Sequence, residues 1–276
     1  LSLGAAGGVL IAGVDRAVVA RAVSLEAVAM FALSGAAYLL AESVMTCAVD
    51  AARPALAQAL GHGDKAEARE LYAKLCRGVA SAAPLAALAL LAANRAFVGA
   101  WAGPKLYGGP ALDLWLASSL VVNLWSLPHR AFLSASLQIR PQTLWRLAEG
   151  GLNFVLSIAL AWRFGIAGVA AGTVLASACT SMWALPRLAA AAGGGPAGRA
   201  WSGFGPSLAA CAALAPLAWW TRELAGLASF GGAMLAAGAV SLAGAALWWR
   251  WGLSRETRLH WQTLARERRA AWQTAV

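Results

Sequence analysis

Long apolar stretches alternate with short polar ones along the whole chain. Glycines, prolines and clusters of charged residues divide it into eight apolar segments. Most of these approach the roughly 20 residues that a helix needs to cross a bilayer. The pattern therefore predicts an all-α integral membrane protein with about eight transmembrane helices. The expected spans are Leu1–Ala22, Ala27–Val49, Gly78–Val98, Leu112–Ala135, Thr143–Trp162, Gly168–Leu185, Ser207–Trp220 and Ser229–Trp249.

The composition also favours lipid over water as the main surroundings of the chain. Hydrophobic residues make up 60% of it and charged residues 12%, whereas soluble domains carry about 25% charged residues. In hydrocarbon, backbone polar groups must be paired inside a helix or a closed barrel. The apolar runs do not alternate with period 2, as barrel strands would. Helices are therefore the expected spanning elements.

Basic residues are distributed unevenly between the two sides of the predicted membrane. With eight spans, alternate loops share a side, and cytoplasmic loops carry an excess of Lys and Arg. Of the 22 basic residues, six fall on one side and Arg130 lies within the fourth span. The other side, which we predict to be cytoplasmic, has fifteen: Arg53, Lys65, Arg69, Lys74, Arg77, Arg140, Arg146, Arg187, Arg199, Arg250, Arg255, Arg258, Arg266, Arg268 and Arg269. Both ends of the chain then lie inside, and any preceding part should contribute an even number of spans.

The net charge of +10 does not indicate a nucleic-acid-binding protein, because the basic residues lie in loops between apolar spans. The loop Asp50–Arg77 is expected to hold a turn and a charged surface helix. The basic tail 251–276 is expected to form an interfacial helix or simply to orient the chain. We find no nucleotide-binding loop, hydrolase elbow or metalloprotease motif. Neither an enzyme nor a bound metal or cofactor is therefore predicted.

Polar residues recur at helical spacing inside four of the spans. A charged group at the bilayer centre costs about 2.5–3.5 kcal/mol, so it usually faces a partner or a cavity. Converging polar stripes of this kind are typical of a transporter cavity. For any single residue, an interhelical hydrogen bond or a side chain that reaches the interface is the simpler explanation, whereas the four stripes together favour a cavity. The stripes are Asp15-Arg16 with Arg21, Tyr38-Glu42-Thr46, Asn123-Ser126-Arg130, and Arg146-Glu149-Asn153.

Four stretches resemble the multidrug/oligosaccharidyl-lipid/polysaccharide exporter superfamily, especially its bacterial O-antigen-type flippases. Three of them are IAGVDRAVVARAVSLEAVAMFALS from Ile11, RPALAQALGHGDKAEARELYAKL from Arg53, and FVGAWAGPKLYGGP from Phe97. The fourth and most specific is EGGLNFVLSIALAWRFGIAGVAAGT from Glu149, which joins Glu-x-x-x-Asn in a span to a Gly-rich tight hairpin. The resemblance covers roughly residues 1–190.

The resemblance implies the second six-helix lobe of a two-lobe exporter that works by alternating access. Residues 1–190 would form this lobe, 191–250 two additional helices, and 251–276 a cytoplasmic tail. The implied activity is flipping of undecaprenyl-pyrophosphate-linked oligosaccharide across the bacterial inner membrane for surface polysaccharide. Candidate protein partners are a polysaccharide polymerase and glycosyltransferases. The predicted cavity-lining residues are Asp15, Arg16, Glu42, Asn123, Arg130, Arg146, Glu149 and Asn153.

Arg130 and Arg146 are the predicted pyrophosphate ligands, because a guanidinium can bind phosphate oxygens with two parallel hydrogen bonds. Two other functions also fit the sequence. A cation-coupled multidrug exporter of the same fold would use carboxylates and an aromatic pocket. A membrane scaffold for polysaccharide-assembly enzymes would use the basic tail or the loop Asp50–Arg77 and would not need the arginines.

Overall fold

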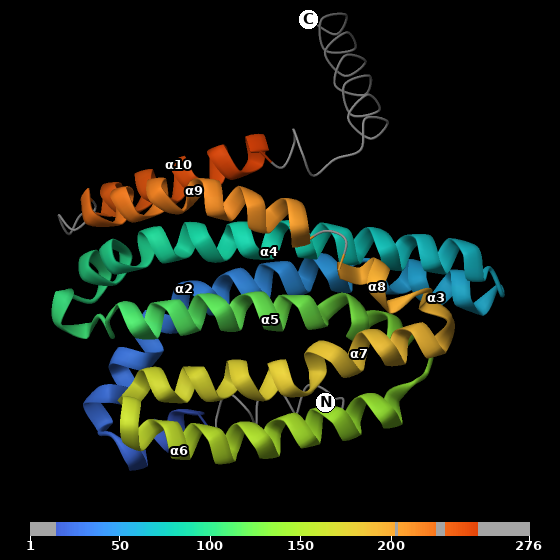
Figure 1. Ribbon diagram of the computed structural model, residues 1–276, viewed down its shortest axis with the longest axis horizontal. Helices are drawn as coiled ribbons and strands as arrows, with labels where there is room; N and C mark the ends of the chain where they lie inside the picture. Colours follow the sequence, from blue (N-terminus) through green and yellow to red (C-terminus); the bar gives the residue numbers. More distant parts are fainter. Residues whose placement is uncertain (1–14, 202–203, 225–229, 248–276) are drawn as a thin grey trace, which may run out of the picture.

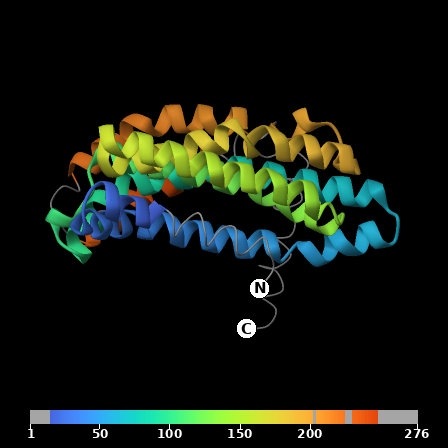
Figure 2. The ribbon, with the colours of Figure 1, turned by 90° about the horizontal axis from the view of Figure 1, so that it is seen from below.

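The computed structural model describes residues 15–201, 204–224 and 230–247. All regular secondary structure in these ranges is helical, which confirms the all-α prediction. Figures 1 and 2 show the long helices running nearly parallel to the longest axis of the molecule. The first predicted span lies mostly outside the described residues, and only residues 15–22 of it are seen, as a short helix.

Helix α2 (Leu25–Asp50) and helix α3 (Arg53–Gly61) follow that segment. The hydroxyl of Ser24 accepts a hydrogen bond from the backbone N–H of Ala27 and so satisfies one of the free donors at the start of α2. Pro54 lies in the first turn of α3, where a missing N–H costs nothing. The second predicted span is thus confirmed as a helix of nearly the expected length.

Helix α4 (Lys65–Trp101) is longer than the sequence pattern indicated. The expected surface helix after Gly63 and the third predicted span form one continuous helix of 37 residues. Asp64 caps it by accepting from the N–H groups of Ala66 and Glu67 at 3.1 and 2.9 Å. The turn and the charged helix after it are confirmed, and this helix continues into the third predicted span because neither Gly78 nor Pro84 interrupts it.

The 3-10 turn η1 (Pro104–Leu106) leads into α5 (Pro110–Ala135), which matches the fourth predicted span. Helix α6 (Ile139–Cys179) is a hairpin, because Gly165 has φ 59° and ψ −139° and reverses the chain. Its first arm is 139–164 and its second arm is 166–179. The helical path breaks again at Thr180, after which α7 (Ser181–Ala189) continues. The fifth and sixth predicted spans are therefore two arms of one hairpin, and the sixth is broken.

Two glycines let the arms of the α6 hairpin approach closely. A Cβ at Gly172 would lie 2.7 Å from the backbone nitrogen of Ser157, and one at Gly168 would meet the carbonyl oxygen of Leu160. The Ser157 hydroxyl donates across the same seam to the carbonyl of Val169 at 3.3 Å. The Gly-x-x-x-Gly spacing at Gly168–Gly172 is thus used for helix packing, as such spacings often are in membranes.

The last described helices cover the outer side of α4 (Figure 1). A π-helical turn η2 (Ala190–Gly194) and the short α8 (Ala197–Ala200) lead to α9 (Phe204–Leu224) and α10 (Phe230–Leu247). The Ser207 hydroxyl donates to the carbonyl of Ala80 at 2.8 Å near one end of α9. At the other end, Arg95 and Glu223 form an ion pair at 3.8 Å.

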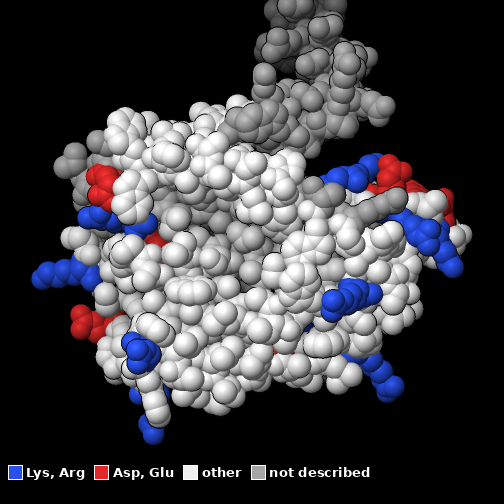
Figure 3. Space-filling model, viewed as in Figure 1, with Lys and Arg blue, Asp and Glu red and all other residues white. Residues whose placement is uncertain are grey.

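Four stretches of the described chain are long and apolar enough to cross a membrane: Leu25–Gly61, Lys65–Trp101, Pro110–Ala135 and Ile139–Gly194. Figure 3 shows Lys and Arg gathered toward the two ends of the molecule, with a broad uncharged band between them. This arrangement is that of a membrane protein, because exposed charges are rare at hydrocarbon depth. The count of about eight spans stays a prediction, and the basic tail 251–276 lies outside the described residues.

Candidate functional site

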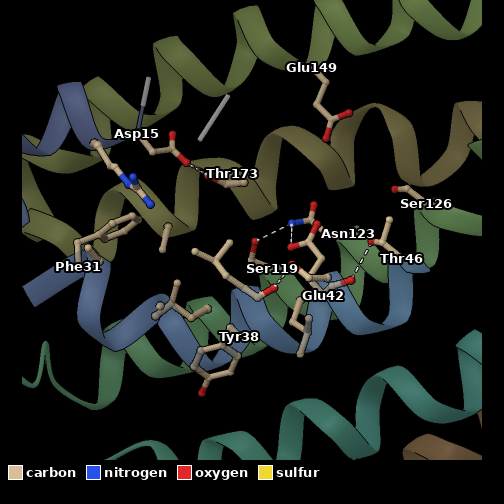
Figure 4. A pocket seen from close by; sticks show the side chains of 18 of the residues that line it. Asp15, Phe31, Tyr38, Glu42, Thr46, Ser119, Asn123, Ser126, Glu149 and Thr173 are labelled. Carbon is tan, nitrogen blue, oxygen red and sulfur yellow. Dashed lines mark hydrogen bonds between the residues drawn. The ribbon is translucent and has the colours of Figure 1, made fainter. Parts of the chain in front are cut away.

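A cavity of about 530 Å³ lies between α2, α5, the two arms of α6 and the segment 15–22. Its size is in the range of small-molecule sites, about 300–1,000 Å³. In Figure 4, Glu42 and Asn123 face each other near the middle, Asp15 and Thr173 lie together at one side, and Glu149 approaches from α6. The lining residues come from segments far apart in the chain, so the cavity is a product of the tertiary fold.

Seven of the eight predicted residues line this cavity: Asp15, Arg16, Glu42, Asn123, Arg130, Arg146 and Glu149. The eighth, Asn153, is 1% exposed and is not among the lining residues. It lies behind the cavity wall, where its amide nitrogen donates to Asp15 at 3.0 Å. The helical spacing places Arg146 and Glu149 on the face of α6 that borders the cavity, whereas Asn153 on the same stripe is bonded to Asp15 behind it.

Asp15 is held by two neighbours and is 7% exposed. One carboxylate oxygen accepts from Asn153, and the other accepts from the Thr173 hydroxyl at 3.1 Å. The carbonyl oxygen of the Asn153 amide in turn accepts from Ser157 at 3.0 Å. These bonds join the segment 15–22 to both arms of the hairpin, so this part of the polar stripe is an interhelical network.

Glu149 is similarly engaged across the hairpin. The hydroxyls of Ser177 and Ser181, which lie on either side of the break at Thr180, both donate to its carboxylate. The side chain is 9% exposed and borders the cavity. Glu149 therefore ties the first arm of α6 to the start of α7, and two neutral donors satisfy its oxygens.

Arg130 and Arg146 differ from these residues in having no hydrogen-bonded partner. Within the described ranges, neither guanidinium forms an ion pair or a side-chain hydrogen bond. The Nε of Arg146 is also buried and unpaired. Their charges act on Glu42, which accepts only a long 3.4 Å hydrogen bond from Asn123. Arg130 is repelled by the charge of Arg146 and attracted by those of Glu42 and Glu149. The cavity thus holds two cations whose hydrogen-bonding capacity is unused.

A second polar cluster, which the sequence did not reveal, lies on the opposite side of α2 and α5. At its centre is Asp113, which is fully buried. Its carboxylate accepts from Asn94 at 2.5 Å, Tyr107 at 2.6 Å and Tyr38 at 3.3 Å. Arg222 of α9 lies 3.6 Å from the same carboxylate and donates to the Tyr107 hydroxyl at 2.5 Å. Polar residues inside predicted spans are the signal that could have found it, since Asn94 and Asp113 both lie in such spans.

Tyr38 connects the Asp113 cluster to the cavity. Its ring belongs to the cavity wall, and Figure 4 shows its hydroxyl directed away from the cavity. Burial, with the nearby Asp113 carboxylate, raises the pKa of Tyr107 in the loop before α5 well above its usual range. That phenol therefore remains a donor to Asp113 at physiological pH. The cluster fixes α2, α4, α5 and α9 relative to one another behind the cavity.

No family model, curated protein or solved structure matches this chain. In the described part of the chain, no group of three or more His, Cys, Asp or Glu side chains could hold a metal ion. Function is therefore inferred from the cavity and its charges.

Proposed function

We propose that this protein is a membrane transporter of the multidrug/oligosaccharidyl-lipid/polysaccharide type and flips polyprenyl-pyrophosphate-linked oligosaccharide across the bacterial inner membrane. The single observation that supports this best is the pair Arg130 and Arg146 in the central cavity, for which the described residues supply no hydrogen bond or ion pair. In this proposal the described bundle is the second lobe of the transporter, with about eight spans in all and a cytoplasmic C-terminus. Helices α9 and α10 are the two additional helices.

The charges of the cavity fit a phosphorylated head group. Buried or half-buried charges are normally paired through hydrogen bonds. The two arginines interact with nearby carboxylates through their charges alone, which leaves their N–H donors available to an anionic ligand. An anion between Arg130 and Arg146 would relieve their mutual repulsion and use the free donors of both. A pyrophosphate offers oxygens on two phosphorus atoms, one for each guanidinium. The polar residues of α2 and α5 beside them, Glu42, Ser119 and Asn123, would contact sugar hydroxyls.

The remaining carboxylates of the cavity argue against a cationic drug as cargo. Asp15 and Glu149 already accept two hydrogen bonds each, from neutral partners. Only Phe31 and Tyr38 supply aromatic rings to the described lining. A cationic drug would need free carboxylates and aromatic faces. Here only Glu42 lacks a short hydrogen bond, and the charges of two arginines act on it.

The test replaces both arginines in a strain that lacks the chromosomal copy. We expect Arg130→Gln with Arg146→Gln to lower surface polysaccharide about tenfold or more, since each lost charged hydrogen bond is worth about 1.5–3 kcal/mol. Lipid-linked oligosaccharide should accumulate while the amount of protein in the membrane stays normal. The measurements are polysaccharide per cell and immunodetection of the protein.

The matched control is Arg140→Gln with Arg163→Gln, which removes the same charge from two exposed arginines outside the cavity. It should leave polysaccharide output unchanged. Normal output from the cavity variant would contradict the flippase. If changes in the loop Asp50–Arg77 alone reduced output, the scaffold would be favoured. If the deletion strain lost only drug resistance, the multidrug exporter would be favoured.

A further inference from the structure

A second hollow lies outside the central cavity, where α7 diverges from the first arm of α6. The break at Thr180 starts this divergence, and the resulting groove has a volume of about 640 Å³. Its floor is one face of α7, and Trp145 on α6 contributes from the other side. The lining residues are Trp145, Cys179, Thr180, Trp183, Ala184, Arg187 and Leu188.

The chemistry of this groove is that of a membrane interface. Trp145 and Trp183 are 41% and 49% exposed, and Arg187 in the last turn of α7 is exposed beside them. Trp side chains gather at the depth of lipid head groups, where the ring lies in the apolar region and the N–H reaches polar atoms. Arg187 is among the basic residues of the predicted cytoplasmic side. Across the described ranges it forms no ion pair or side-chain hydrogen bond.

Trp183 is held in place from behind by stacked aromatic rings. It stacks on Trp201 with ring centroids 5.2 Å apart and planes inclined by 29°. Trp201 packs in turn on the fully buried Trp125, at a centroid distance of 4.5 Å. The ring on the groove wall is therefore fixed by the core and does not need to be ordered when a ligand binds, which favours binding.

We propose that this groove binds the head group of an anionic phospholipid of the cytoplasmic leaflet. The Arg187 guanidinium would contact the phosphodiester, the indole N–H groups of Trp145 and Trp183 would donate to phosphate or ester oxygens, and an acyl chain would lie along Ala184 and Leu188. Charge complementarity selects an anionic lipid over a zwitterionic one, because the only charged residue in the described lining of the groove is positive. The site is separate from the central cavity and independent of the cargo.

The test measures binding of defined lipids to the purified 276-residue chain in detergent by native mass spectrometry. Phosphatidylglycerol and phosphatidylcholine with the same acyl chains are added in turn. We expect phosphatidylglycerol to bind at least about fivefold more tightly, which corresponds to about 1 kcal/mol for one basic residue near the surface. Arg187→Gln should remove this preference.

The matched control is Arg140→Gln, because Arg140 is exposed, belongs to the same predicted side and lies outside the groove. It should retain the preference within about twofold. Equal loss in both variants, or equal binding of both lipids by the unmodified chain, would overturn the proposal in favour of nonspecific attraction. Competition by inorganic phosphate at the same concentration would overturn it in favour of a site for a free anion.

Discussion

Replacing Asp113 by Ala is expected to destabilise the protein strongly, because it removes the fully buried centre of a polar cluster. The exchange leaves Arg222, with 8% of its side chain exposed, without its counter-charge and removes the acceptor of Tyr38, Asn94 and Tyr107. Removing one partner of a buried ion pair costs about 3–5 kcal/mol. For a chain of this size, about 3 kcal/mol lowers the melting temperature by about 6–12 °C. Thermal unfolding in detergent, followed by size-exclusion chromatography, measures this change.

The control for Asp113→Ala is Glu70→Ala, which removes a carboxylate from an exposed pair. Glu70 lies 2.7 Å from Lys74 in the next turn of α4, and 65% of its side chain is exposed. We expect no measurable change in melting temperature for this variant, because exposed pairs contribute little. Adding Arg222→Gln to Asp113→Ala should recover part of the loss, because the uncompensated charge is then removed. Equal melting temperatures for the two alanine variants would contradict a stabilising role of the Asp113 cluster.

Helical spacing groups the polar residues of single helices on one face, and most members of these groups line the cavity. Asn123, Ser126 and Arg130 share one face of α5, and Arg146 and Glu149 share one face of α6, as the offsets of three and four residues indicate. The sequence could not show which of these groups would be paired. Glu149 is satisfied by serines 28 and 32 residues further along the chain, whereas Arg146 is not satisfied. That distinction depends on the hairpin geometry and decides which residues are free to bind an anion.

The Asp113 cluster escaped prediction because its members share no period. Asp113 meets Tyr38 of α2 from 75 residues away, and Arg222 meets Tyr107 from 115 residues away. Only the packing of α2, α4, α5 and α9 brings them together.

The length of α4 was missed for a local reason. Its charged first half and apolar second half differ in surroundings, but no helix-breaking residue separates them, since a single glycine such as Gly78 costs only about 1 kcal/mol in a helix.

Gly172→Leu is expected to force the two arms of the α6 hairpin apart. A Cβ at this position would lie 2.6–2.9 Å from atoms of Ser157, including the backbone nitrogen, which cannot move without shifting the whole first arm. Overpacking of this kind costs about 1–3 kcal/mol or more. The neighbouring Thr173 would also be displaced from Asp15, so the wall of the cavity would change with the packing. We expect less folded protein in the membrane and a lower melting temperature.

Gly151→Leu provides a matched comparison for this prediction, because it places the same side chain on the first arm of α6 where nothing lies within 4 Å of the new Cβ. Leu is also the better helix former, by up to about 1 kcal/mol over Gly. This variant should therefore fold at least as well as the unmodified chain. If both variants retained normal expression and melting temperature, close contact between the arms would not be required for folding. A loss confined to Gly172→Leu would show that folding requires the close approach of the two arms at the Gly168–Gly172 seam.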